Sequence, residues 1–138
     1  MNKHPWILSV LMLSVAAPLG AATDVEMEAC HYTAEVKREL QITTEQEPQV
    51  EKIYSDLAPM LRQIQNAMAE REQLRRQEAG EEGIEEATRK IIALENKCRN
   101  RGHELLRPIL TEEQFQLILE MEEVHRRKAR AARQPTHP

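Results

Sequence analysis

The apolar residues between Thr44 and Ala79 recur at steps of three and four. Gly80-Glu81-Glu82-Gly83 then predicts a turn, and the segment from Ile84 to Arg107 repeats the same spacing. Such spacing places apolar side chains along one face of a helix that packs lengthwise on another helix. Two such segments joined by a glycine-containing turn predict a long antiparallel helical hairpin. The predicted seam residues are Val50, Ile53, Leu57, Met60, Ile64, Ala67 and Leu74, and then Ile84, Ala87, Ile91, Leu94, Cys98 and Leu105.

Two shorter segments extend this pattern to an all-α fold of four helices. Asp24 to Leu40 carries one apolar stripe, and a last helix is expected from Thr111, after Pro108 has ended the third. Pro59 lies inside the second segment, where it should kink the helix and curve the hairpin. Pro48 follows Thr44 closely, so that helix has either a distorted first turn or a later start.

The first 22 residues have the pattern of a cleavable signal peptide. A short basic head precedes an apolar run from Trp6 to Ala17, and Gly20-Ala21-Ala22 supplies the small residues of a cleavage site. The apolar run is shorter than the roughly 20 residues that a membrane span needs. We therefore expect export to the periplasm, no membrane span after cleavage, and one mature domain over residues 23–138, with a flexible C-terminal tail from about residue 131.

The composition of the mature chain excludes several functions. Removing Lys3 from the 19 Lys and Arg leaves 18 against 23 Asp and Glu, a net charge of −5. An acidic chain with only Tyr32, Tyr54 and Phe115 as aromatics lacks both the basic surface and the stacking platform of a nucleic-acid-binding protein. No nucleophile triad, phosphate loop or HExxH metal motif occurs, so we expect a binding protein rather than an enzyme.

Two helix-start motifs are the clearest local signal. In Leu110-Thr111-Glu112-Glu113-Gln114, Thr111 as N-cap would accept a hydrogen bond from the Gln114 amide, and the Gln114 side chain would reach back to the Thr111 amide. Ile42-Thr43-Thr44-Glu45-Gln46 has the same form. The six expected cap residues are Ile42, Thr43, Gln46, Leu110, Thr111 and Gln114.

With these two motifs in an exported helical chain, the sequence resembles the Spy/CpxP family of periplasmic stress proteins, whose signature is Leu-Thr-x-x-Gln. The resemblance covers essentially the whole mature chain, although the first copy has Ile42 where leucine is typical. It implies a curved four-helix protomer that pairs into a cradle-like homodimer. It also implies an ATP-independent chaperone for partly unfolded envelope proteins, or an inhibitor of an envelope sensor kinase; relatives in the wider family bind zinc or sense metals.

Cys30 and Cys98 are the only cysteines. An even count in an oxidising compartment suggests a disulfide, within one chain or between two, but free or metal-bound thiols remain alternatives. With His31 and His103 the cysteines form a possible tetrahedral zinc ligand set. Their spacing matches no recognised zinc pattern, so a disulfide with two surface histidines is the favoured interpretation and no cofactor is expected.

The remaining functional candidates lie on the second helix. Methionine suits adaptable apolar contacts, and arginine attracts acidic or unfolded segments at a distance. The alternative is that these methionines are core or dimer contacts and the arginines a solvated face. The candidate client-binding residues are Met60, Leu61, Arg62, Met68, Arg71 and Arg75.

Overall fold

The computed structural model describes residues 23–134, so the predicted signal peptide lies outside the described residues. The described part contains four α-helices and no strand, which confirms the predicted all-α class. The helices are α1 (Ala34–Glu39), α2 (Glu47–Arg76), α3 (Glu81–Leu106) and α4 (Glu112–Arg133).

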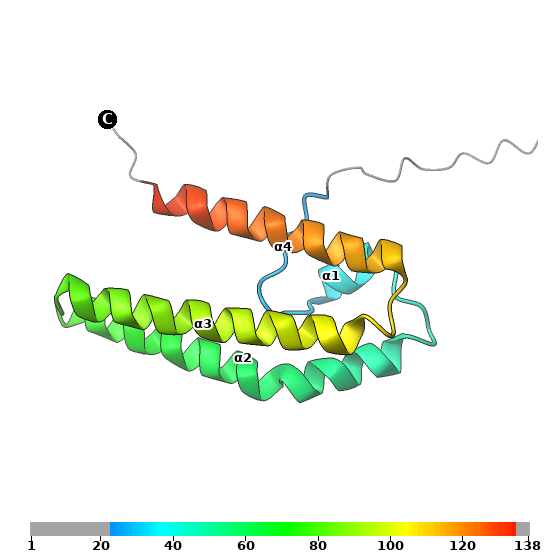
Figure 1. The fold of residues 1–138 in the computed structure, drawn as a ribbon, viewed down its shortest axis with the longest axis horizontal. Coiled ribbons are helices and arrows are strands. Elements are labelled where there is room, and N and C mark those ends of the chain that lie inside the picture. Colours follow the sequence, from blue (N-terminus) through cyan, green and yellow to red (C-terminus); the bar gives the residue numbers. More distant parts are fainter. Residues whose placement is uncertain (1–22, 135–138) are drawn as a thin grey trace, which may run out of the picture.

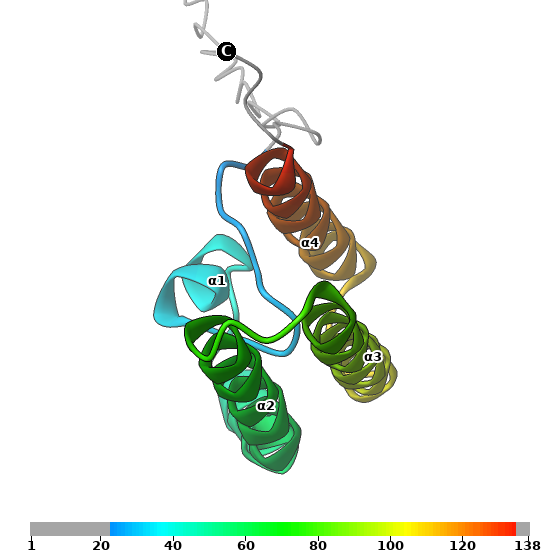
Figure 2. The same cartoon turned by 90° about the vertical axis from the view of Figure 1, so that its left-hand side faces the viewer.

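Helices α2 and α3 run antiparallel and side by side along their length (Figure 1). Ile53, Leu57 and Ile64 of α2 are buried, as are Ile91 and Cys98 of α3, because the three- and four-residue spacing aligns them on facing sides. Helix α4 folds back along α3, so that α3 lies at the corner between α2 and α4 when the molecule is viewed end-on (Figure 2).

The turn between α2 and α3 differs from the predicted glycine turn. Helix α2 ends at Arg76, and Glu78 adopts the left-handed conformation with φ 53°. The Ala79 amide then donates to the Leu74 carbonyl at 3.0 Å, which satisfies an end carbonyl of α2. Gly80 is the N-cap of α3, and Gly83 lies inside that helix. The turn therefore comes earlier than the two glycines suggested.

The start of α2 resolves the alternatives that Pro48 raised. Thr43 to Gln46 form a turn, and α2 begins at Glu47, later than the motif suggests. Pro48 then falls in the first helical turn, where a residue without an amide hydrogen loses no helix bond. Helix α2 continues through Pro59.

The prediction of a helix from Asp24 to Leu40 is wrong over most of its length. Residues 23–33, here called the strap, contain no helix, and α1 begins only after Thr33, whose hydroxyl accepts from the Val36 amide. Cys30 has φ 61°, which a right-handed helix cannot accommodate. The apolar residues of the strap are instead buried in an irregular segment that passes between α2 and α4 and turns at Ala29 and Cys30 (Figure 2).

Helix α4 reaches into the segment that was expected to be a flexible C-terminal tail. Helix α4 extends to Arg133, so residues 131–133 are helical, and residues 135–138 lie outside the described part. In the described residues, full burial on α4 is confined to its first half, from Gln114 to Glu122. The core therefore lies where the strap, α1 and the first half of α4 pack on the hairpin.

Candidate functional site

The two glutamines of the helix-start motifs bond to each other. Gln46 Nε2 donates to Gln114 Oε1 at 2.8 Å, and Gln114 Nε2 donates to Gln46 Oε1 at 2.9 Å. Each glutamine also closes its own motif, because its Oε1 accepts from the amide of Thr43 or Thr111 at 3.0 Å. The amides of Gln46 and Gln114 then donate back to these threonine hydroxyls at 3.2 Å. We call this paired arrangement the glutamine clasp.

The clasp joins segments that are far apart in sequence. Gln114 Nε2 also donates to the Leu40 carbonyl at 3.0 Å, and Gln46 Nε2 to the Ile109 carbonyl at 3.1 Å. The side chain of Gln114 is buried, so these bonds supply partners that water cannot. Thr111 thus caps α4, whereas the predicted cap Thr43 closes only the turn that precedes α2, whose N-cap is Gln46. The clasp also ties the starts of α2 and α4 to the end of α1.

Cys30 of the strap and Cys98 of α3 form a disulfide within the chain, with Cα atoms 5.9 Å apart. Both residues are almost completely buried, at 1% and 0% exposed. Met27 of the strap donates its backbone amide to the Met121 carbonyl of α4 at 3.2 Å, and the ring of Tyr32 meets that of Tyr54 on α2 edge-on. The strap therefore contacts all three long helices.

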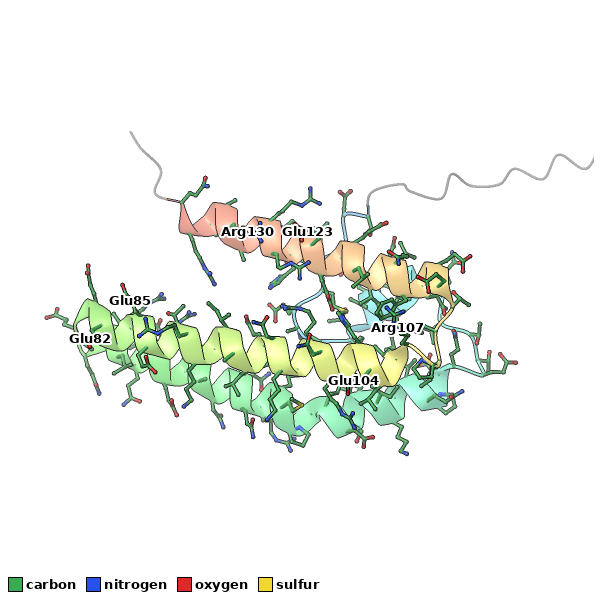
Figure 3. The ribbon with its side chains drawn as sticks, in the orientation of Figure 1. Glu82, Glu85, Glu104, Arg107, Glu123 and Arg130 are labelled. Atoms are coloured by element: carbon green, nitrogen blue, oxygen red, sulfur yellow. A yellow bond between two sulfur atoms is a disulfide. The ribbon has the colours of Figure 1, made fainter. Side chains whose placement is uncertain are left out.

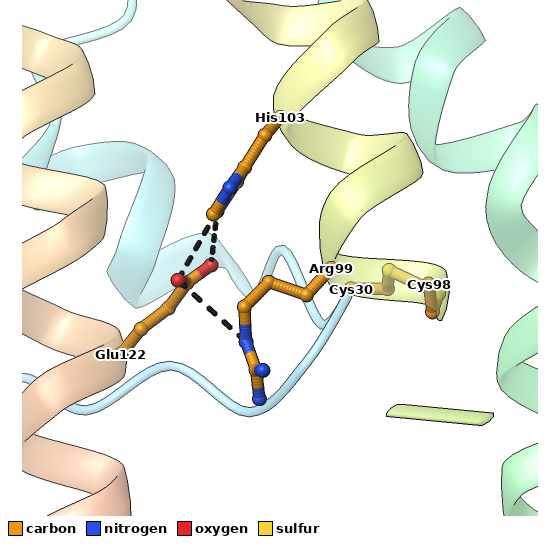
Figure 4. Close-up of a disulfide and its surroundings, with 5 residues drawn as sticks. All are labelled: Cys30, Cys98, Arg99, His103 and Glu122. Carbon is orange, nitrogen blue, oxygen red and sulfur yellow. Dashed lines mark hydrogen bonds and ion pairs between the residues drawn. A yellow bond between two sulfur atoms is a disulfide. The ribbon is translucent and has the colours of Figure 1, made fainter. Parts of the chain in front are cut away.

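A buried carboxylate links α4 to α3. Glu122 is 3% exposed and lies 2.9 Å from His103 Nε2 and 3.7 Å from Arg99 Nε. Figure 4 shows His103 and Arg99 reaching from α3 toward Glu122, while Cys98 leaves α3 on another side. The Glu122 position follows Ile118 by one turn on the apolar face of α4, which was the sequence signal for its burial.

Tyr32 packs closely against α3 beside this carboxylate. Burial raises the pKa of its hydroxyl above the ordinary value, and the negative charge of Glu122 adds to the shift. A β-carbon added at Gly102 would lie 2.8 Å from the Tyr32 hydroxyl oxygen, so only glycine leaves room for this approach. The neutral phenol and the helix glycine thus form one packed contact.

The predicted zinc ligands do not form a site in this arrangement. The two thiols are joined in the disulfide and are not free to bind metal. His31 lies 3.7 Å from Glu28, whereas His103 is paired with Glu122. Within residues 23–134, no three His, Cys, Asp or Glu side chains gather in a way that would hold a metal ion.

The six candidate client-binding residues have different environments. Met60 is half-buried and packs against the core, and Leu61 is half-buried. Arg71 reaches across to Thr88 of α3 at 3.5 Å, so its role includes joining the hairpin. Arg75 pairs with Glu72 on its own helix, at 4.0 Å, and Arg62 is exposed. Of the six, Met68 is the apolar side chain most open to solvent, at 37%.

Ile92, which the sequence pattern did not single out, is the other exposed large apolar residue of the described part, at 39%. It follows Thr88 by four residues, and Met68 precedes Arg71 by three. Arg71 and Thr88 face each other across the antiparallel hairpin. Met68 and Ile92, each about one helical turn away from one of them, therefore lie at the same height along the hairpin and on the same side of it. The preceding residue, Ile91, occupies the buried seam position, so the apolar spacing did not single out Ile92.

This apolar pair lies where α4 ends. Ile92 precedes His103 by eleven residues, three turns of helix, so it shares the side of α3 that faces α4. Counting eleven residues forward from Glu122 on α4 reaches Arg133, the last residue of that helix. The eleven-residue stretch from Ile92 back to Glu81 spans about 16 Å of helix. Figure 1 shows the hairpin extending past the end of α4. We call this region, where Met68 and Ile92 are exposed beside the end of α4 and the hairpin continues past it, the step.

Opposite charges flank the step. Figure 3 shows Glu82 and Glu85 at the free end of the hairpin and Arg130 near the end of α4. Arg126 and Lys128 are engaged by Glu123 and Glu26, at 2.8 and 3.1 Å. Among the described residues around the step, the exposed charged side chains that form no ion pair are acidic at the hairpin end and basic on α4. They are Glu78, Glu81, Glu82, Arg127, Arg130 and Arg133.

No family model, curated protein or solved structure matches the chain. Among the described residues, none of the helices combines the length and the apolar character needed to cross a membrane.

Proposed function

We propose that this protein is an exported, ATP-independent chaperone of the Spy/CpxP type that binds partly unfolded periplasmic proteins. The observation that carries the proposal is the step, where Met68 and Ile92 are exposed at one level beside the end of α4. A contiguous exposed apolar patch rimmed by polar residues marks a binding site on many soluble proteins. Arg75 lies one heptad beyond Met68 on α2, and the residue count along α4 places Arg133 level with Ile92, so arginines occur on both α2 and α4 near the step.

The chemistry of the step favours weak and adaptable binding. Methionine has an unbranched side chain that adjusts to different partners. The bordering arginines would attract acidic segments at a distance, and the apolar pair would hold them after contact. Neither contribution needs nucleotide or catalysis.

Export is supported by the signal-peptide pattern of residues 1–22 and by the intramolecular disulfide. Disulfides persist in oxidising compartments such as the bacterial periplasm. A periplasmic chaperone has no access to cytosolic ATP, which agrees with the expectation of a binding protein.

The step also supports the proposed cradle-like homodimer. An interface with two-fold symmetry requires one surface to complement itself. The acidic hairpin end and the basic end of α4 lie outside the apolar pair, so two antiparallel copies that match these ends alone would leave Met68 and Ile92 open to clients. A kink at Pro59 would curve the two hairpins into a cradle. Sedimentation at low and high salt tests this pairing, because screening should weaken it.

The decisive experiment measures aggregation of a chemically reduced client protein with an equimolar amount of the purified chain. Wild-type protein should slow aggregation, and the double variant Met68→Ser/Ile92→Ser should lose most of the effect. Ala69→Ser/Ala93→Ser is the matched control, because both alanines are exposed and adjoin the same two positions. If wild-type protein has no effect on aggregation, the chaperone proposal is wrong.

A pull-down from envelope extract separates the chaperone from the kinase-inhibitor alternative. Capture of many unrelated proteins, reduced by Met68→Ser/Ile92→Ser, supports the chaperone. Stoichiometric capture of one sensor kinase supports the inhibitor instead.

A further inference from the structure

The strap is buried but forms few backbone hydrogen bonds with the rest of the molecule. Met27, Ala29, Cys30 and Tyr32 are each less than a tenth exposed. In the described residues, however, one backbone hydrogen bond joins the strap to a long helix, from Met27 to Met121. A segment without helix or sheet bonds opens more easily than its burial alone suggests. Its docking must therefore depend on side chains and on the disulfide.

The disulfide is formed by the strap residue that has a positive φ. Cys30 has φ 61°, in the left-handed region that residues other than glycine rarely occupy. A non-glycine residue stays in this conformation only when its surroundings hold it there. At Cys30 those surroundings are the bond to Cys98 and the packing of the strap on α3.

The strap covers an apolar surface formed by the three long helices. Leu57 of α2, Leu106 of α3 and Met121 of α4 belong to one core cluster with Met27 and the two cysteines, and each is at most 1% exposed. These residues come from three helices that meet around the strap (Figure 2). Removing the strap would open a continuous apolar surface among α2, α3 and α4.

We propose that the strap is a redox-released cover. With the Cys30–Cys98 disulfide formed, the strap closes the space among the three long helices. With the disulfide reduced, the strap leaves, the four helices keep their structure, and the apolar surface beneath becomes accessible. The cover does not depend on the client-binding proposal, because its opening is measured on the protein alone.

The chemical step is thiol–disulfide exchange with a dithiol reductant. One reductant thiolate attacks a sulfur of the Cys30–Cys98 bond, which breaks and leaves a mixed disulfide and one cysteine thiolate. The second reductant thiol then displaces the remaining cysteine sulfur. The reductant ends as a disulfide, and its two hydrogens reside on Cys30 and Cys98.

Because both sulfurs are buried, the attack must wait for the strap to open. The rate of reduction by dithiothreitol should therefore stop rising at high reductant concentration. Met27→Ala removes the side chain that anchors the strap near Met121 and should accelerate reduction at least about tenfold. Leu74→Ala is the matched control, because it shortens a large apolar side chain near the far end of α2; its rate of reduction should equal that of wild type.

Hydrogen exchange compares the oxidised protein, the protein reduced by dithiothreitol, and the variant Cys30→Ala/Cys98→Ala. After reduction and in the variant, the strap amides that form backbone hydrogen bonds in the oxidised protein, those of Met27, His31 and Thr33, should exchange at least about a hundredfold faster, and an apolar dye should bind. Amides of α2 and α3 should remain protected, and helical circular dichroism should persist. An unchanged strap would overturn the proposal. Loss of all four helices would overturn it equally, because reduction would then unfold the protein and not uncover a surface.

Discussion

The molecule has two halves with different constructions. The closed half comprises the strap, α1, the hairpin up to Ile64 and from Ala93, and α4 up to Glu122; it holds the disulfide, the glutamine clasp and the Glu122 cluster. The open half comprises residues 65–92 and 123–134. There, only Ala67 and Ile91 are buried, and the other ordered contacts are mainly surface ion pairs. Stability should therefore come from one half, which leaves the other free for binding.

The largest expected effect compares two isoleucines. Ile118 is completely buried in the closed half, so Ile118→Ala should lower the free energy of unfolding by about 3 kcal/mol through lost burial and a residual cavity. Ile92 is 39% exposed, and Ile92→Ala should cost less than about 1 kcal/mol. Urea unfolding followed by circular dichroism measures both. Equal losses would show that the division into halves is wrong.

A buried and an exposed ion pair give the second comparison. Glu122→Gln removes the charge that Arg99 and His103 share, and should cost about 2 kcal/mol because it leaves a largely buried guanidinium unpaired. Glu70→Gln removes the partner of Lys90, 3.2 Å away on the hairpin surface, and should leave stability unchanged within error. Adding salt should not restore the Glu122→Gln loss. If Glu122→Gln leaves the free energy of unfolding unchanged, the Glu122 cluster does not hold α4 on α3.

The sequence predicted those parts of each half that depend on neighbouring residues. The seams of α2 and α3 and the cap at Thr111 follow from spacings within one helix, and these local rules held. The path of the strap was not predicted. Ala29, Tyr32 and Val36 have helical spacing, although Ala29 and Tyr32 are buried in a segment that is not helical. The bond to Cys98 and the Met27–Met121 hydrogen bond decide its path, and both are long-range.

The same limit applies to the candidate site. Each motif glutamine could be assigned to its own cap, but the pairing of Gln46 with Gln114 across 68 residues is a tertiary contact that no local pattern contains. The sequence predicted Met68 as a candidate because arginine and methionine cluster on the second helix. Ile92 was missed, because the register between α2 and α3 and the end of α4 together decide its exposure.

Two glycines of α3 give the third comparison. Alanine normally stabilises a helix interior relative to glycine by about 1 kcal/mol. At Gly83, in the open half, an added β-carbon meets nothing within 4 Å, so Gly83→Ala should stabilise by up to about this amount. At Gly102 it meets the Tyr32 hydroxyl at 2.8 Å, so Gly102→Ala should instead cost about 2 kcal/mol. Thermal unfolding should shift in opposite directions for the two variants. Pairing Gly102→Ala with Tyr32→Phe should recover part of its loss.

Alkaline pH should affect the closed half through Tyr32. Its pKa is raised in the folded protein, chiefly by burial, so the folded state keeps a proton that the unfolded state releases. This contribution is complete below pH about 10 and is lost as the pH rises through the raised pKa, by about 1.4 kcal/mol per pH unit. Unfolding measured between pH about 8 and about 11 should show no slope from Tyr32 below pH about 10, the ordinary tyrosine pKa, and the onset of this slope above it. Tyr32→Phe should reduce the slope; the same slope in both proteins would assign it to other groups.

The smallest effect separates the two helix-start motifs. Thr111 caps α4 directly, and Thr111→Ala should cost about 1 kcal/mol, because the Gln114 amide loses its acceptor at the start of a helix. Thr43 caps a turn that precedes α2, and Gln46, not Thr43, is the N-cap of that helix. The Gln46 amide also donates to the Thr43 carbonyl at 3.1 Å, so it keeps a partner in Thr43→Ala, which should cost about half as much or less. Both variants leave the clasp and the step in place, so aggregation of a client should be slowed as by wild type. A cap variant that lost this activity would place the function in the motifs and not at the step.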